Sequence, residues 1–175
     1  MNKDESLVKT NSPEASSPVF VEAEQMFDKL AAITRETAAK AFDFFMARGS
    51  QFGSHLEDWL RAESETLRTA PVKITDTKDI VNVMIAVPGF KANEIEVSVK
   101  EDRLIVSGET TEETRNDEEN TYYNEWRSNR FLRELTLPCN AQTENIVAEL
   151  KNGVLKLSLK KMAEVEATKV AVKSA

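Results

Sequence analysis

The fold is decided by residues 146–159, which read IVAELKNGVLKLSL. Aliphatic side chains alternate with other residues on both sides of Asn152-Gly153, at Ile146, Ala148, Leu150, Leu155, Leu157 and Leu159. A period of two is typical of strands that have one buried face. Because Asn-Gly tolerates the positive φ values of a tight turn, the stretch predicts a β-hairpin.

The same alternation recurs upstream, from Pro71 onward. Turn residues such as Pro88-Gly89 separate the segments that carry it. These segments are residues 81–87, 95–99, 104–108 and 131–137. About six or seven short strands at this spacing, with no helix between them, predict an all-β antiparallel sandwich of the immunoglobulin-like kind over residues 70–161.

A charged segment interrupts the strand series between residues 109 and 120. It has little apolar content and is long for a hairpin loop, which is typical of a loop that is mobile or engaged elsewhere. Its acidic cluster, Glu112-Glu113 with Asp117-Glu118-Glu119, lacks the Asp-x-Asp-x-Asp-Gly order of an EF-hand. We therefore interpret the cluster as part of a solvated loop rather than as a cation site.

Residues 1–18 and 19–69 precede the sandwich. The first range is polar and contains two prolines, so we expect it to be disordered. From Val19 onward apolar residues recur every three or four positions, which predicts an amphipathic helix that ends at Arg48-Gly49. The stretch from Ser54 to Glu57 fits a capping box and opens a second helix. The two helices are expected to form a hairpin around the glycines between them.

The charge balance argues against nucleic acid as a partner. With 23 Lys and Arg against 30 Asp and Glu, the net charge is −7, so phosphate backbones would repel the chain. No apolar run is long enough to span a bilayer, and the polar start lacks the apolar region of a secretory signal. The single cysteine, Cys139, permits no internal disulfide and suits a reducing compartment. These features predict a cytoplasmic chain without membrane contact.

Reactive groups are too few for the common kinds of active site. His55 is the only histidine, and no Gly-x-Ser-x-Gly motif accompanies it. One Cys and one His are too few for a typical zinc site, and the chain has no P-loop. We therefore predict no catalytic residue, no metal site and no cofactor. We interpret Cys139 as a structural or incidental thiol rather than a redox sensor, because no cation lies close to it in sequence.

What remains is surface that can bind polypeptides. A sandwich has edge strands whose unpaired amides and carbonyls can accept another strand. The C-terminal tail, residues 162–175, offers such a ligand in Val170 and Val172, two β-branched residues on one face of an extended segment. The periodicity leaves open whether these valines dock on a neighbouring molecule or belong to a frayed tail without a role.

Several motifs occur in a recognisable order, among them VPGF at 87–90, RLIVSGE at 103–109, FLRELTLP at 131–138 and AELKNGVL at 148–155. Together they resemble the small heat-shock proteins, the Hsp20 or α-crystallin family, over roughly residues 70 to 161. The residues that match the family signature are Ala148, Gly153, Val154 and Leu155.

The resemblance implies an ATP-independent chaperone, or holdase. Such a protein binds unfolding client proteins under stress, prevents their aggregation and passes them to ATP-dependent chaperones. It also implies a homo-oligomer. In bacterial members an extended loop pairs with the partner's sandwich to make a dimer, and that role falls here on Glu109 to Tyr123, with Glu109, Glu119, Tyr122 and Tyr123 as the candidate residues.

The family's C-terminal Ile/Val-x-Ile/Val motif plugs a groove between two edge strands of another subunit, and Val170 and Val172 match this motif. The resemblance places the groove, which is open to tail or client, at Val97, Val99, Ile146, Ala148 and Leu150. Valine in place of isoleucine removes one methylene per residue, about 0.8 kcal/mol each if fully buried. We therefore expect a weaker plug that exchanges faster.

The predicted helices have a likeness of their own. Residues 39–49 and 55–63 resemble a short bacterial domain of unknown function. In small heat-shock proteins the N-terminal arm commonly contacts clients, and Met and Phe side chains adapt to irregular partners. The candidates here are Phe20, Met26, Phe27, Phe42, Phe44, Phe45 and Met46. The alternative is that these side chains only bury one another or pack on the sandwich.

Two other functional hypotheses differ from the holdase. The same sandwich can serve as an adaptor, a co-chaperone-like module that docks on one folded partner. A hydrolase that uses His55 belongs to a third class, and full activity of a His55→Ala variant would exclude it.

Overall fold

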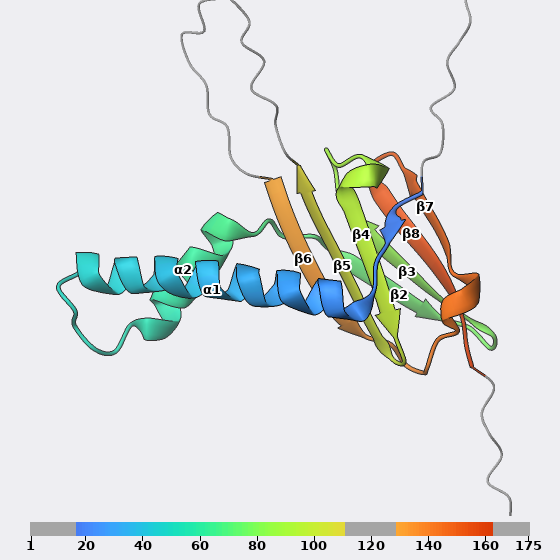
Figure 1. Cartoon of the computed structure of the whole chain (residues 1–175), viewed down its shortest axis with the longest axis horizontal. Helices are drawn as coiled ribbons and strands as arrows, with labels where there is room; N and C mark the ends of the chain where they lie inside the picture. The colour runs from blue at the N-terminus through green and yellow to red at the C-terminus, as the bar shows by residue number, and fades with distance from the viewer. Residues whose placement is uncertain (1–16, 111–128, 163–175) are drawn as a thin grey trace, which may run out of the picture.

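Two four-stranded sheets face each other in the computed structural model of the chain, which describes residues 17–110 and 129–162 (Figure 1). One sheet has the order β1–β4–β5–β6 and consists of β1 (Val19–Phe20), β4 (Ile95–Lys100), β5 (Arg103–Thr110) and β6 (Asn129–Thr136). The other has the order β2–β3–β8–β7 and consists of β2 (Val72–Asp76), β3 (Ile80–Ala86), β8 (Val154–Lys160) and β7 (Val147–Lys151). Short 3-10 helices, Ala92–Glu94 and Thr143–Asn145, precede β4 and β7. The described strand pairs are antiparallel apart from β1 with β4.

The core lies between the two sheets and is made by the side chains that the alternation predicted. In the second sheet Val83 of β3 lies opposite Leu157 of β8, and Leu104 of β5 lies opposite Leu135 of β6 in the first. The fully buried positions are Val81, Val83, Ile85, Val87, Ile95, Val97, Leu104, Val106, Phe131, Leu155, Leu157 and Leu159. The predicted fold class, an antiparallel β-sandwich with a helical region before it, is therefore confirmed.

Two glycines allow close approaches that the sandwich needs. Gly108 in β5 lies opposite Phe131, and a Cβ at Gly108 would overlap the phenyl ring. That ring in turn meets Phe90 edge-on, with the ring centroids 4.9 Å apart. Gly153 has a φ of +71°, and a Cβ there would lie 3.0 Å from Pro88 Cα. Because Asn152 also has a positive φ of 52°, the predicted Asn-Gly turn is confirmed.

The predicted helical hairpin is present as α1 (Ala23–Ala47) and α2 (His55–Thr66), but two details of the prediction are wrong. The first helix begins at Ala23 rather than at Val19, because Val19 and the next residue pair with β4 as a strand. Ser54 precedes α2, yet its φ of −107° and ψ of 27° are not extended, and its side chain caps nothing. The capping box is therefore absent.

The alternation did not identify β2, the edge strand of its sheet. Val72 is half-buried, and the other four residues of the strand are exposed. A strand with so little covered surface carries a weak hydrophobic pattern, since the pattern arises from burial of one face.

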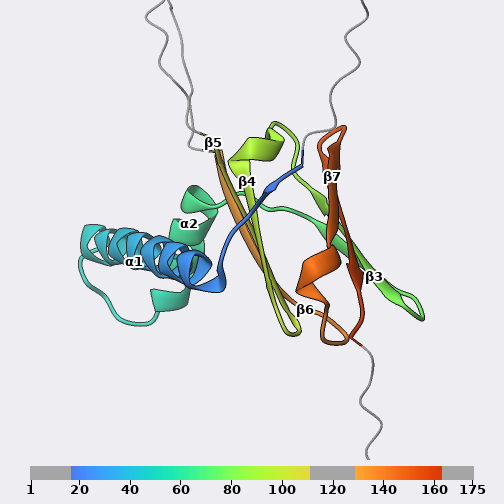
Figure 2. The same ribbon diagram turned by 45° about the vertical axis from the view of Figure 1, so that its right-hand side comes forward.

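Helix α1 lies across the outer face of the sheet that contains β4, β5 and β6, and the hairpin extends beyond the β6 edge (Figures 1 and 2). Two ion pairs mark its path. Lys29 Nζ lies 2.5 Å from Glu96 Oε2 on β4, and Glu36 Oε2 lies 2.6 Å from the Arg130 guanidinium on β6. The helix thus spans the sheet before it packs against α2.

Candidate functional site

The residues predicted to line the groove lie on two strand regions that pack against one core. Val97 and Val99 belong to β4, whereas Ala148 and Leu150 belong to β7 and Ile146 immediately precedes it. Val97 is fully buried, and the other four are partly buried side chains that pack on the same core cluster. All five thus pack on one core, with β4 in one sheet and β7 in the other (Figure 2), and the groove between them stays a prediction.

The β7 side of the predicted groove lies at an edge of its sheet. β7 is an edge strand and pairs only with β8 among the described residues. Its inward side chains, Ala148 and Leu150, stay half-exposed, and the outward Val147 is 67% exposed. Apolar side chains beside a free strand edge are the arrangement that accepts an extended peptide by β-augmentation.

The β4 side of the groove carries the short strand β1. Val19 lies beside Glu96 and Phe20 beside Val97, in parallel register. The Val21 amide donates a hydrogen bond of 3.0 Å to the Val97 carbonyl. The sequence did not predict this strand, because its residues also fit the start of the helical period. A run of β-branched and aromatic residues directly after Pro18 was the signal that favoured a strand.

The outer face of β4 and β5 is covered by the N-terminal half of α1. Ser98, Ile105 and Ser107 point to this face, because they alternate with residues that face the core, and all three are buried. On the helix, Met26 is fully buried and Ile33 is nearly so. The alternative that the N-terminal side chains pack on the sandwich therefore fits Met26, whereas Phe27 stays 43% exposed.

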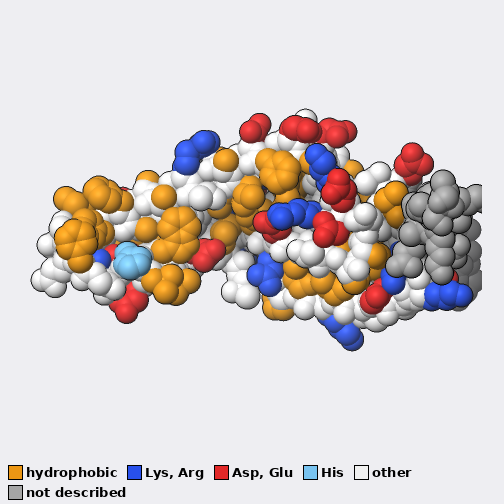
Figure 3. All heavy atoms as spheres, turned by 90° about the horizontal axis from the view of Figure 1, so that it is seen from below, with side chains coloured by type: hydrophobic (Ala, Val, Ile, Leu, Met, Phe, Trp, Pro, Cys, Tyr) orange, Lys and Arg blue, Asp and Glu red, His pale blue; other side chains and the backbone are white. Residues whose placement is uncertain are grey.

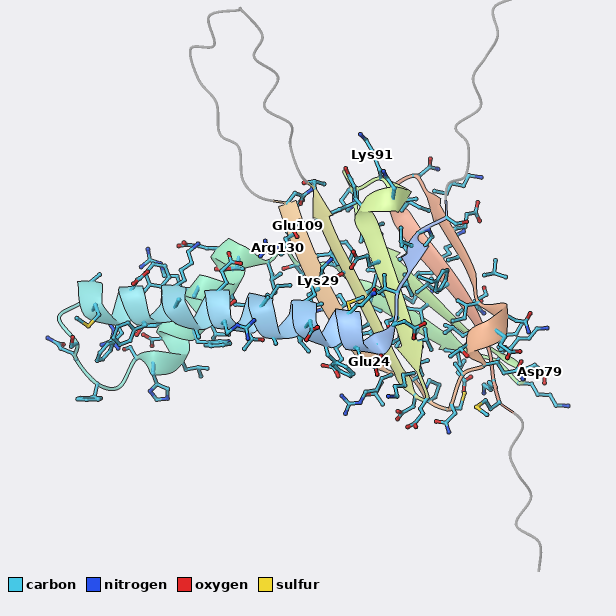
Figure 4. All side chains as sticks on the ribbon, in the orientation of Figure 1. Glu24, Lys29, Asp79, Lys91, Glu109 and Arg130 are labelled. Carbon is cyan, nitrogen blue, oxygen red and sulfur yellow. The ribbon has the colours of Figure 1, made fainter. Side chains whose placement is uncertain are left out.

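Arg130 connects three parts of the molecule at the start of β6 (Figure 4). Its guanidinium lies 2.6 Å from Glu109 Oε1 on β5 and 2.6 Å from Glu36 Oε2 on α1. Its carbonyl accepts a 2.8 Å hydrogen bond from the Arg68 amide of the segment after α2. The hydrogen bond with Glu109 raises the pKa of Arg130 most, and Glu36 adds to the rise against the opposing effect of partial burial. Glu109, predicted to begin the dimerisation loop, is thus engaged within its own chain.

Apolar side chains gather at the far end of the helical hairpin, away from the sandwich. Figure 3 shows them as a group of hydrophobic side chains around the single histidine, His55. The exposed members are Phe42, Met46, Phe52, Leu56 and Leu60, of which Phe52 is 96% exposed. We call these five residues the hairpin-end patch. Monomeric soluble proteins rarely expose large contiguous apolar patches, so a patch of this kind usually marks a binding surface.

Aromatic packing gives the hairpin-end patch its shape. The rings of Phe42 and Phe45 are tilted with centroids 5.9 Å apart, and Phe45 and Phe52 are 6.0 Å apart. The Arg61 guanidinium lies 4.1 Å from the Phe44 ring centroid, within cation–π range. These contacts leave Phe44 and Phe45 half-buried and Phe42 exposed.

The seven candidate client residues fall into three groups. Phe42 and Met46 lie in the hairpin-end patch, with Phe44 and Phe45 beside it. Phe20 and Phe27 are exposed near β4 instead. Met26 is fully buried, so it reaches a partner only if α1 leaves the sheet. The sequence reasoning missed Phe52, Leu56 and Leu60. Leu56, Trp59 and Leu60 are spaced i, i+3 and i+4, which predicts a single packed face of α2. The structure instead buries the face that carries Asp58, Ala62 and Thr66.

Within residues 17–110 and 129–162, no three His, Cys, Asp or Glu side chains gather as a metal site would require. His55 is exposed, and Cys139 is a half-buried free thiol at a strand end. No helix in this part of the chain is long and apolar enough to cross a membrane. Several predicted site residues lie outside the described residues: Glu119, Tyr122, Tyr123, Val170 and Val172.

The sequence matches a family model and several known proteins. The model of the Hsp20/alpha crystallin family matches residues 73–173, which begin in β2 and leave α1 and α2 outside the match. Spore protein SP21 from Stigmatella aurantiaca is 36% identical over 102 residues, which cover 58% of this chain and 60% of that protein. An 18.8 kDa class II heat shock protein from Ipomoea nil is 36% identical over 119 residues, 65% of this chain and 71% of its own length. The solved structure of heat shock protein 16.0 from Schizosaccharomyces pombe is 29% identical, covers 61% of this chain and 99% of its own, and gives a TM-score of 0.47.

Proposed function

The chain belongs to the Hsp20/alpha crystallin family, and on this premise we propose that it is an ATP-independent holdase. It binds proteins that unfold under stress, keeps them from aggregating and releases them to ATP-dependent chaperones in the cytoplasm. This role needs apolar surface that is available without a nucleotide-driven step.

The observation that carries this proposal is the hairpin-end patch. It joins side chains from both helices and from the turn between them, and it lies far from the core of the sandwich. Adaptable Phe, Met and Leu side chains suit irregular partners such as unfolding chains. Because the sandwich has its own closed core, clients can occupy the patch without disturbing the sheets.

Two further surfaces supply self-association in this proposal. The tail residues Val170 and Val172 dock in the groove of β4 and β7 on another subunit and build larger assemblies. The segment from Glu109 to Tyr123 pairs with the sandwich of a partner to make the dimer. β2 is a suitable acceptor, because it pairs only with β3 among the described residues and its outer edge is available.

Light scattering of a heat-denaturing enzyme tests the holdase role directly. In the absence of ATP, equimolar subunits of the protein are expected to suppress the rise in scattering. Scattering as high as in the enzyme alone would refute the proposal.

The hairpin-end patch is tested by Phe52→Ser with Leu60→Ser. Both side chains are exposed, so the double variant is expected to fold normally and to lose most of the suppression. Met162→Ser is the matched control, since its side chain is 54% exposed, as is that of Leu60, and lies after β8, outside the patch. Full suppression by the double variant would place client binding elsewhere.

The tail assignment is tested separately, by Val170→Ala with Val172→Ala. The assembly is expected to become smaller by static light scattering, whereas the control Val165→Ala in the same tail leaves its size unchanged. An unchanged size in the double variant would reject the plug.

The second candidate function is an adaptor for one folded partner. It is favoured by the ion pairs Lys29–Glu96 and Glu36–Arg130, which set the direction of α1 on the sheet and so the place of the hairpin-end patch in the folded chain. A monomer that never suppresses aggregation but binds a single protein would support the adaptor over the holdase.

A further inference from the structure

The edge of β4, where the proposed seat for the tail begins, is already paired in this structure. β1 runs along it with Val19 beside Glu96 and Phe20 beside Val97, and the Val21 amide donates to the Val97 carbonyl. An edge strand offers a single free row of donors and acceptors. A second strand therefore cannot pair with these residues of β4 while β1 is in place.

Phe20 also lies on the groove side of the sheet. Paired residues of neighbouring strands point to the same face, and Val97 points into the core. Phe20 therefore covers the β4 side of the groove, although 47% of its surface stays exposed. Pro18, which alternation places on the same face, is buried. The β4 edge of the predicted groove is thus covered by side chains as well as by backbone.

The contacts of β1 itself do little to hold it on β4. It is two residues long, and Val19 is 44% exposed. What holds it near β4 is the helix that follows, through the pair between Lys29 and Glu96 and through the fully buried Met26. A segment tethered in this way has a high local concentration at the edge, while each of its contacts is weak enough to exchange.

We propose that Pro18 to Val21 is a built-in competitor of the C-terminal tail, so that a tail from another subunit docks only where this N-terminal cap has opened. The proposal rests on the tail seat proposed above. Both occupants are short segments rich in β-branched residues, Val-Phe-Val at 19–21 and Val-Ala-Val at 170–172. The apparent affinity of the tail then falls as the fraction of molecules with a closed cap rises. Assembly is thereby coupled to release of the N-terminal segment.

Peptide binding to the full-length chain tests this competition. The host carries Val170→Ala and Val172→Ala, so that its own tail does not compete, and the probe is a fluorescent peptide with the sequence of residues 164–175. Val21→Pro deletes the amide that bonds Val97, whereas the control Val21→Ala keeps it. We expect the proline variant to bind the peptide about fivefold more tightly than the alanine variant, the effect of one backbone hydrogen bond of about 1 kcal/mol.

A disulfide lock tests the same point from the opposite side. Val19 and Glu96 are direct neighbours, and adjacent strands lie about 4.8 Å apart, within reach of a disulfide. A V19C/E96C variant, made with Cys139→Ser, is expected to lose at least tenfold in peptide affinity when oxidised and to regain it on reduction. The reduced protein is the control for the oxidised one, so the test does not depend on the proline variant folding.

The outcomes separate the competition from the tail seat. Equal affinity in the proline and alanine variants, or in the oxidised and reduced lock, would overturn the competition and leave the seat standing. Absence of binding to every variant, including the proline variant, would reject the seat itself and the competition with it.

Discussion

The sandwich and the helical hairpin differ in how their positions are fixed. In β3 and β8 every second side chain is fully buried against the facing sheet. In α1, by contrast, three of 25 residues are buried, namely Met26, Ile33 and Thr37. The hairpin is held instead by ion pairs at its margins and leaves apolar side chains in water at its end.

This difference suits the two regions to distinct roles in the proposed function. A closed core gives the sandwich the stability to serve as a scaffold for assembly. Segments with few buried apolar contacts open at lower free energy than the rest of a protein, and binding surfaces are often drawn from them. We therefore expect the hairpin to loosen before the sandwich and to present more apolar surface as it does so.

The largest effect is expected from Leu157→Ala in the centre of β8. Leu157 is fully buried opposite Val83, so the substitution leaves a cavity that the tightly paired sheets cannot close. It should lower the free energy of unfolding of the sandwich by about 2–5 kcal/mol in a urea titration. Lys156→Ala, next to it but exposed, is the control and should change little. An effect as small as that of the control would mean that the sandwich is not the firmly packed region.

A smaller effect is expected from Gly108→Ala. The new Cβ overlaps the Phe131 ring, which cannot move freely because Phe90 packs against it edge-on. Overpacking of this kind costs about 1–3 kcal/mol, and the melting temperature of the sandwich should fall accordingly. Thermal denaturation followed by the sheet signal in circular dichroism measures it. An unchanged melting temperature would show that the Phe90–Phe131 pair has room to shift.

Most of the sandwich could be predicted from the sequence, and the reasons are local. Burial of one face forces alternation on β3, β4, β5, β6 and β8, and Asn152-Gly153 specifies its turn through positive φ values. The alternation did not predict β2, because the side chains of this strand are mostly exposed. The close contact of Gly108 with Phe131 could not be predicted either, since a glycine in a strand does not indicate which ring will lie over it.

A more local effect is expected from Arg48→Gln in the hairpin. The guanidinium bonds Asp58 through Nε at 3.0 Å and through a terminal nitrogen at 2.8 Å, and Asp58 is largely buried. Loss of the cation should destabilise the hairpin by about 1–2 kcal/mol while the sandwich melts as before. Arg35→Gln, on the exposed side of the same helix, is the control. A matching drop in the melting temperature of the sandwich would contradict the separation of the two regions.

The candidate site was less predictable than the fold. The residues of the predicted groove follow from the strand pattern and the family resemblance, and the structure packs them on the core of the sandwich. The placement of Val19 and Phe20 on β4 depends on a free strand edge far away in sequence, so their helical spacing misled the prediction. The exposure of Leu56 and Leu60 likewise depends on which face of α2 meets α1, which no local pattern specifies.

The smallest effect is expected from Glu65, which faces Lys40 across the two helices at 3.1 Å. The hydrogen bond from Lys40 lowers the pKa of Glu65 below its usual 4.5. The folded state therefore favours the carboxylate, and its contribution is complete above pH 4.5 and is lost as the pH falls through the lower folded-state value. Wild type should be slightly more stable than Glu65→Gln near neutral pH and equal to it in stronger acid. A difference that persists in acid would point to a cause other than the charge.

Hydrogen–deuterium exchange on the full-length protein tests the central comparison most directly. It should be recorded at rising temperature, up to the point at which the protein suppresses aggregation of a client. The amides of α1 and α2 are predicted to lose protection there while those of β3 and β8 keep it. Simultaneous loss of protection in both regions, or earlier loss in the sandwich, would contradict the account.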